Sequence, residues 1–286
     1  MTAMAARNAT DRATPPAYPA GQRVTQIRVL RSEWTKLRSL RSTVWSLLTA
    51  AALMVATSLL VCTLKAGNSS SGSGSGSGGA SGGGSVDSTT LSLSGVYFAQ
   101  VAVGVLGVLL FSGEYGTGLV RTTFAAVPRR LPVLWAKAGA FAAAVFCVSA
   151  AGSLAAFLVG QAVLAPKHLD MTLGQPGVAR AVLGGALYLT AVGLFAVGLG
   201  ALLRNTAAAV SGLLGVLVVA PVVADFLPHP LKDQVSEYLP GGAGVSVIDV
   251  LPSSYVLAPW TGLGVLCLYV VAVIALAAWR LQRRDV

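Results

Sequence analysis

The sequence ARAVLGGALYLTAVGLFAVGLGALL, residues 179–203, contains a single charged residue, Arg180, near its beginning. A helix needs about 20 mostly apolar residues to cross the hydrocarbon core of a bilayer. In lipid, every backbone N–H and C=O must be paired within the structure, and a helix pairs its own. The stretch therefore predicts a membrane-spanning helix.

Five further runs meet the same criterion, at residues 44–64, 91–112, 133–164, 206–226 and 259–279. Only Arg204 and Asn205 separate the run ending at 203 from the run beginning at 206, so these two could instead form one very long helix. Two spans are favoured, because the pair far exceeds one bilayer thickness. The alternating ten-residue segments of a membrane barrel do not occur. The sequence thus predicts an all-α, polytopic membrane protein with six transmembrane helices.

The composition of the 286 residues leads to the same class, with 55% hydrophobic and only 10% charged residues. Soluble domains carry roughly 45–50% apolar and about 25% charged residues. The chain therefore cannot cover a water-facing surface, and it is too apolar for disorder. Its three cysteines are far apart in apolar runs, and its two histidines lack ligand spacing, so neither disulfides nor a metal site are expected.

The formal net charge of +10 is distributed unevenly along the chain. With six crossings, sixteen of the 20 Lys and Arg residues fall on one side, and only Lys65, Lys167, Arg180 and Lys232 on the other. Basic residues mark the cytoplasmic side of a membrane protein, so both termini are predicted to be cytoplasmic. No basic stretch follows a nucleic-acid-binding pattern, and no nucleic acid partner is expected.

The connections differ in character. Residues 1–22 are predicted to be a disordered cytoplasmic tail, and residues 66–90 a flexible external loop, nearly all Gly and Ser over 69–85. Residues 227–258 mix prolines with apolar residues. We expect this last connection to fold as short re-entrant helices in the outer leaflet, shielded by neighbouring spans.

Two cytoplasmic segments carry the candidate functional residues. Residues 23–42 have the pattern of an amphipathic helix on the inner membrane surface, with the interface residues Ile27, Arg28, Arg31, Trp34, Lys36 and Arg38. The alternative is a simple positive-inside anchor, and the two interpretations are compatible. Residues 113–132, GEYGTGLVRTTFAAVPRRLP, are long for a hairpin and have an apolar face of their own. This favours a docking surface for a cytoplasmic partner over a plain charged connector.

An energy source within the chain is not expected. The middle of each predicted span has no Asp, Glu, Lys or Arg, which argues against a secondary transporter and an intramembrane enzyme. The chain has no GxxxxGK[ST] phosphate-binding loop, so we expect it neither to bind ATP nor to be an enzyme.

The blocks RVLRSEWTKLRSLRSTVW (28–45), FSGEYGTGLVRTTFAAVPRRLPVLWAKA (111–138), LGALLRNTAAAV (199–210), YLPGGAG (238–244) and the terminal LQRRDV occur in an order that resembles the six-span permease subunits of bacterial type-2 ABC exporters, including bacitracin-type drug-export permeases. The resemblance covers roughly residues 24–286, and its second block is the most specific. The long Gly/Ser-rich external loop departs from the family pattern.

The resemblance implies a permease that acts as a dimer with two separate ATP-binding subunits, to which ATP and magnesium would bind. It implies that 113–132 is the coupling segment gripped by the ATPase. The expected ATPase contacts are Glu114, Tyr115, Gly116, Thr117, Arg121, Phe124, Pro128, Arg129 and Arg130. A bacterial plasma membrane would be its location. The alternative hypothesis is a non-transporting membrane anchor or scaffold that docks a regulatory protein.

The amphipathic segment yields a first prediction. Trp34 is expected at headgroup depth, with Lys36 and Arg38 toward the lipid phosphates. In a variant that keeps Trp34 as its single tryptophan, a lipid-attached quencher should therefore dim the fluorescence. Unquenched emission at the wavelength of tryptophan in water would show that the segment is a free tail.

Overall fold

The computed structural model describes residues 31–32, 34–35, 39, 41–68, 88–117, 130–167, 171–228, 231–250 and 257–283. These residues form helices and turns and no strand, and six helices are long and apolar enough to cross a membrane. The long helices are α2 (Arg41–Asn68), α4 (Val96–Thr117), α6 (Arg130–Leu164), α7 (Val178–Leu203) and α12 (Pro259–Arg283). The remaining span, Thr206–Asp225, is built from three consecutive pieces. The predicted all-α polytopic membrane fold is confirmed.

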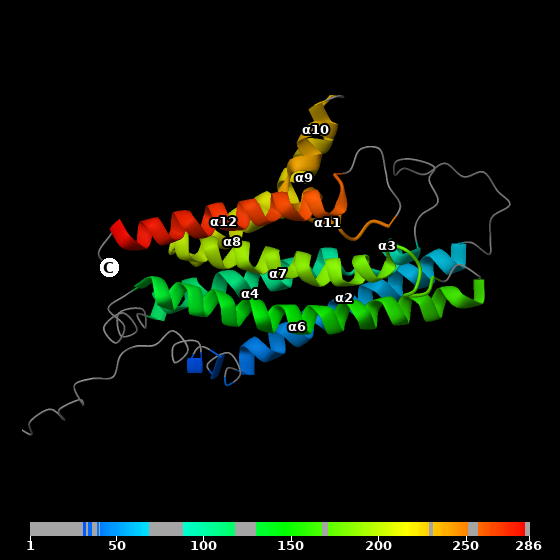
Figure 1. Ribbon diagram of the computed structural model, residues 1–286, viewed down its shortest axis with the longest axis horizontal. Helices are drawn as coiled ribbons and strands as arrows, with labels where there is room; N and C mark the ends of the chain where they lie inside the picture. Colours follow the sequence, from blue (N-terminus) through cyan, green and yellow to red (C-terminus); the bar gives the residue numbers. More distant parts are fainter. Residues whose placement is uncertain are drawn as a thin grey trace, which may run out of the picture.

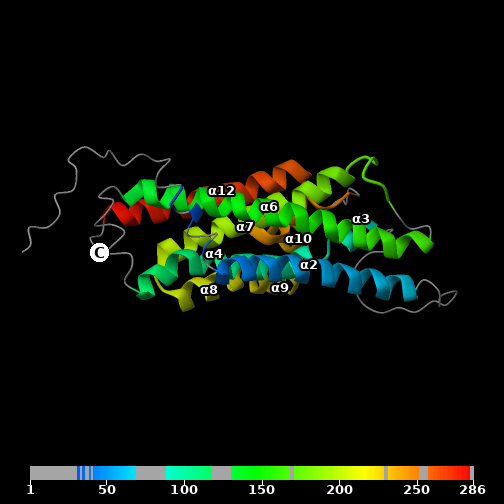
Figure 2. The same ribbon diagram turned by 90° about the horizontal axis from the view of Figure 1, so that it is seen from below.

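Helix α7 occupies the centre of the bundle. It packs against α4, α6, α12 and α8, and the long helices run side by side along the longest axis of the molecule (Figures 1 and 2). The central position appears in its burial: 67% of the α7 span is buried within the chain, against 22% for Thr206–Asp225. The span Val96–Gly113 is half buried, and the other four spans leave most of their residues to face lipid or partners.

The two runs on either side of Arg204 form separate helices that pack against each other. Arg204 adopts a left-handed conformation with φ of 55°, and its N–H bonds to the carbonyl oxygen of Gly200 at the end of α7. Asn205 is extended, and its side chain accepts a hydrogen bond from the N–H of Ala208, which caps the start of α8 (Thr206–Leu214). These two residues reverse the chain, and the expectation of two spans is confirmed.

The fifth span is not a regular helix. After α8 come a π-helical turn, η2 (Gly215–Val219), and α9 (Ala220–Asp225). In η2 the N–H of Ala220 reaches back five residues to the carbonyl oxygen of Gly215. Pro221 follows directly, and its ring would clash with the carbonyl group of Leu217 in a regular helix. The wider π-helical turn accommodates the proline.

Two short helices join the fifth and sixth spans, as predicted for residues 227–258. Helix α10 (Leu231–Tyr238) is amphipathic and leads away from the long axis in Figure 1, while α11 (Pro240–Val245) is buried against α12 and α7. The contact with α12 is close, because a methyl group on Gly262 would lie 2.0 Å from Ser246 Oγ and 2.2 Å from the carbonyl oxygen of Ala243. The burial of α11 agrees with the expectation that neighbouring spans shield this connection.

The second predicted span began too early. Residues 88–92 form a separate short helix, α3 (Ser88–Ser92), and a turn precedes α4 at Val96. At this turn a methyl group on Gly95 would lie 2.0 Å from the carbonyl oxygen of Met54 in α2. The backbone of this turn lies directly against the backbone of α2. A continuous helix, which has side chains on every face, could not approach α2 so closely.

Several of the segments predicted above fall partly outside the described residues. Of the amphipathic segment, Arg31, Ser32, Trp34, Thr35 and Ser39 are helical, and Trp34 is 45% exposed. Ile27, Arg28, Lys36 and Arg38 lie outside the described residues, as do the tail 1–22 and residues 69–87 of the external loop.

The close contact of α11 with α12 yields a second prediction. Gly262→Ala should lower the stability by about 1–3 kcal/mol, because the methyl group overlaps the backbone of Ala243. Gly264→Ala is the matched control, since no other atom lies within 4 Å of a methyl group there. Thermal unfolding of both variants in detergent, followed by size-exclusion chromatography, measures the difference. Equal midpoints would contradict the close packing of α11.

Candidate functional site

The candidate site lies at the end of the bundle where α4 ends, α6 begins, α7 turns into α8 and α12 ends (Figure 1). We call it the arginine-rich end, after Arg130, Arg204, Arg280 and Arg283. Of the predicted contact segment 113–132, residues 114–117 form the last turn of α4, and Arg130 begins α6. Arg121, Phe124, Pro128 and Arg129 lie outside the described residues. The described ends of the segment therefore belong to two long helices, α4 and α6.

Lys137 joins these two helices. It lies in α6, about 10 Å along the axis from Arg130 at 1.5 Å per residue, and only 2% of it is exposed. Its ammonium group donates a hydrogen bond to the carbonyl oxygen of Leu110 in α4 at 3.3 Å, and it lies 5.4 Å from the ring centroid of Phe111. A buried lysine requires such partners, because an unpaired charge in an apolar interior is costly.

The sequence analysis counted Lys137 only as one of the sixteen basic residues on the cytoplasmic side, near the start of the predicted run 133–164. The structure adds that the residue is buried in α6 and contacts α4. The signal that could have found it is a lone lysine embedded in a long apolar run, a pattern that favours a functional or structural partner within the bundle.

The same part of α4 is also tied to the start of the fifth span. The hydroxyl group of Thr206, the first residue of α8, donates to Ser112 Oγ at 3.0 Å, and Ser112 in turn donates to the carbonyl oxygen of Val108 at 2.9 Å. Ser112 is 1% exposed. The end of α4 that leads into the contact segment is thus fixed to α6 on one side and to α8 on the other.

Helix α4 is held against α7 by direct backbone contact. A methyl group on Gly107 would lie 2.6 Å from the carbonyl oxygen of Gly193, and one on Gly200 would lie 2.8 Å from that of Val108. Small residues at such positions allow helices in membranes to pack closely and to gain dispersion energy. A displacement of the end of α4 would therefore also act on the central helix.

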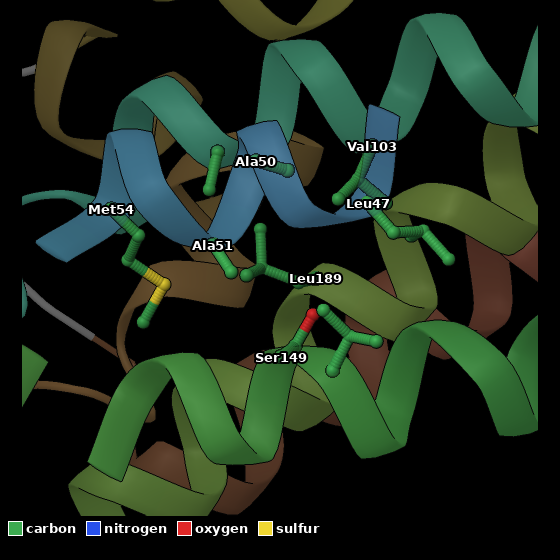
Figure 3. A pocket seen from close by; sticks show the side chains of 9 residues that line it. Leu47, Ala50, Ala51, Met54, Val103, Ser149 and Leu189 are labelled. Atoms are coloured by element: carbon green, nitrogen blue, oxygen red, sulfur yellow. The ribbon is translucent and has the colours of Figure 1, made fainter. Parts of the chain in front are cut away.

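The interior of the bundle has no room for a substrate where α2, α4, α6 and α7 meet. A void there, lined by Leu47, Met54, Val103, Ser149 and Leu189 among others (Figure 3), measures about 10 Å³. That is about the space of one water, which would need two or more polar partners, whereas the lining is apolar apart from Ser149.

A larger groove of about 560 Å³ opens between α2 and α4. It is lined by Ser46, Thr49, Leu53, Phe98, Val101, Ala102, Val105, Leu106 and Leu109. Its size falls within the range of small-molecule sites, roughly 300–1,000 Å³. The hydroxyl group of Thr49 bonds to the carbonyl oxygen of Trp45 in its own helix, so the groove is mainly apolar.

Two groups of polar side chains stabilise the rest of the bundle. Near its middle, the hydroxyl group of the buried Tyr188 in α7 donates to Gln100 Oε1 in α4. At the end opposite to the arginine-rich end, Gln161 of α6 donates to Ser92 Oγ at 3.1 Å and accepts from the N–H of Met171 at 2.7 Å. These contacts satisfy buried polar groups and fix α3 on α6.

No group of three or more His, Cys, Asp and Glu side chains that could hold a metal ion occurs among the described residues. The described part of the site contains hydrogen-bond donors and acceptors that join helices. Comparison with models of known protein families gives no match, and comparison with curated proteins gives none either. The family resemblance therefore remains an expectation based on the residues.

The contact between Ser112 and Thr206 yields a third prediction. Ser112→Ala and Thr206→Val should each lower the free energy of unfolding. The loss in the double variant should be smaller than the sum of the two single losses. The expected coupling is about 0.5–1.5 kcal/mol, the net value of one hydrogen bond. Unfolding in mixed detergent micelles measures it.

The matched control pairs Ser112→Ala with Thr190→Val, because the Thr190 hydroxyl bonds only to Ala186 of its own helix among the contacts seen. That pair should be additive. Additive losses for Ser112→Ala with Thr206→Val would show that the hydroxyl groups do not join α4 to α8.

Proposed function

We propose that this chain is the membrane-spanning permease subunit of an ATP-driven bacterial exporter in the plasma membrane, with both termini in the cytoplasm. The observation that supports this proposal best is the fixation of the end of α4. It contacts α6 through Lys137 and α8 through Thr206, at the point where residues 114–117 lead into the segment expected to contact an ATPase.

The mechanism follows from these contacts. An ATPase subunit that pulls or pushes the segment between α4 and α6 acts on both helices at once, because Lys137 joins them. The same force reaches the fifth span through Thr206 and α7 through the backbone contact at Gly200. Helices that are packed this tightly move together as rigid units, because their interfaces do not deform continuously.

A second copy of the chain is part of the proposal. The void among α2, α4, α6 and α7 is too small for a substrate, and the groove of about 560 Å³ is open rather than enclosed by the chain. A pathway that uses this groove needs another body opposite it. A homodimer with two ATPase subunits, each binding ATP and magnesium, would supply the pathway and the energy.

The alternative, a membrane anchor that docks a regulatory protein, is supported by the same contact segment but not by its mechanical links. An anchor needs only an exposed segment. It does not need Lys137 buried between α4 and α6, or a hydroxyl contact between α4 and α8. These links favour the transport subunit over the anchor.

The contact segment yields a fourth prediction. Glu114→Ala and Arg121→Ala should leave membrane insertion intact and weaken ATPase binding or uncouple ATP hydrolysis from export. A charge-assisted hydrogen bond contributes about 1.5–3 kcal/mol, so the affinity should fall by roughly tenfold or more for each lost contact. Co-purification and ATPase activity of the reconstituted complex measure the effect.

Lys232→Ala is the matched control. Its ammonium group forms an ion pair with Asp225 at 3.2 Å, far along the chain from the contact segment. This variant should bind the ATPase normally. Normal assembly and coupling in Glu114→Ala, Arg121→Ala and a block replacement of residues 117–127 would reduce the segment to a connector and refute the proposal.

A further inference from the structure

The fifth span consists of two parts that have different neighbours. The first part, α8, packs against α4 and α7 and is joined to Ser112 through Thr206. The second part, α9, packs against α10, to which the ion pair between Asp225 and Lys232 also joins it. In Figure 1, α8 follows the long axis of the bundle, and α9 turns away from it toward α10. The π-helical turn η2 lies between the two parts.

The backbone of η2 has fewer constraints than a regular helix. The N–H of Ala220 bonds to Gly215 five residues back, and Pro221 has no N–H to offer to the carbonyl oxygen of Leu217. Helix α11 approaches this carbonyl, since a methyl group on Gly241 would lie 3.6 Å from it. π-Helical turns and prolines are the usual causes of a sharp bend in a helix.

The surroundings of η2 leave room for movement. No atom from outside the turn lies within 4 Å of a methyl group built on Gly215, and Val218, Val219, Val222 and Val223 are 43–55% exposed. Leu217 of η2 and Ala224 of α9 are buried, as Ala209 and Leu213 of α8 are. Helix α8, however, also meets the inner helices α4 and α7 directly. The neighbours of the fifth span therefore change at η2, from α4 and α7 before the turn to α10 and α11 beyond it.

We propose that η2, together with Pro221, is a hinge within the fifth span. Movement at this hinge changes the angle of α9 relative to α8, which stays packed on α4 and α7, while the far end of α10 keeps its contacts with α11 and α12. This is a property of the fold that goes beyond the proposed transport function. It needs neither an ATPase nor a substrate, so it can fail or hold independently of that function.

The hinge can be tested by distance measurements between paired spin labels in the full chain in nanodiscs. The three natural cysteines are replaced by alanine, and labels are placed at exposed positions. The mobile pair joins Leu158 of α6 to Val223 of α9, and the fixed pair joins Leu158 to Ala207 of α8. Labelled chains are diluted with unlabelled chains, so that each measured distance lies within one molecule.

The variant Gly215→Ala with Pro221→Ala removes the causes of the bend. It adds a donor for the Leu217 carbonyl group and a methyl group that meets no neighbour. The matched control is Gly212→Ala in α8, where the nearest contact of the methyl group is an ordinary 3.9 Å to Leu203. If the double variant does not fold, Gly215→Ala alone serves as the test.

In the unmodified span we expect a broad distance distribution for the mobile pair and a narrow one for the fixed pair. The hinge variant should narrow the distance distribution of the mobile pair to the width found for the fixed pair. Gly212→Ala should change neither distribution. A mobile pair that is already narrow in the unmodified span would show a rigid bend and overturn the proposal. A distribution that stays broad in the hinge variant would place the flexibility elsewhere and overturn it as well.

Discussion

The close approach of α7 to the helices around it holds the whole bundle together. Lipid tails are as apolar as leucine side chains, so helices in a membrane gain little from burying apolar surface against each other. They associate when their backbones come close. Methyl groups on Gly193 and Gly198 of α7 would lie 2.9 Å from Phe141 of α6 and Val273 of α12. Three neighbours are therefore positioned by one helix, since Gly200 does the same for α4.

Polar contacts then determine which movements the bundle permits. Tyr188 and Gln100 join α7 to α4 near the middle, and Gln161 holds α3 on α6 at one end. At the arginine-rich end, Lys137 and Thr206 join α4 to α6 and α8. A buried hydrogen bond without water to replace it is expensive to break. The core of α4, α6, α7 and α8 is thus expected to move as one body. Helices α9 and α10 are attached to it through η2 at one end and through the contacts of α10 with α11 and α12 at the other.

This division of the molecule suits a subunit that receives force at one end. The end of α4 lies where Lys137 and Thr206 join it to α6 and α8. The freer part, α9, lies beyond the π-helical turn of the fifth span and packs against fewer helices than α8 does. A force on α4 is transmitted to α6, α7 and α8 through close contacts. The freer part can then change its angle without disturbing the glycine contacts of α7.

The class of the protein and the number of its spans could be predicted from the order of its amino acids. Twenty-residue apolar runs cannot avoid the membrane, and a chain in the membrane must pair its own backbone, so six helices followed from the apolar pattern. The turn at Arg204 and Asn205 was also predictable, because one charged and one capping residue interrupt two apolar runs. Three features emerged only from the packing of the helices: Lys137 is buried against Leu110, residues 91–95 do not belong to the second span, and Gly215–Val219 is π-helical. Each of these depends on which backbone lies next to which, and a pattern of apolar residues specifies that a helix faces lipid but not which neighbour it meets.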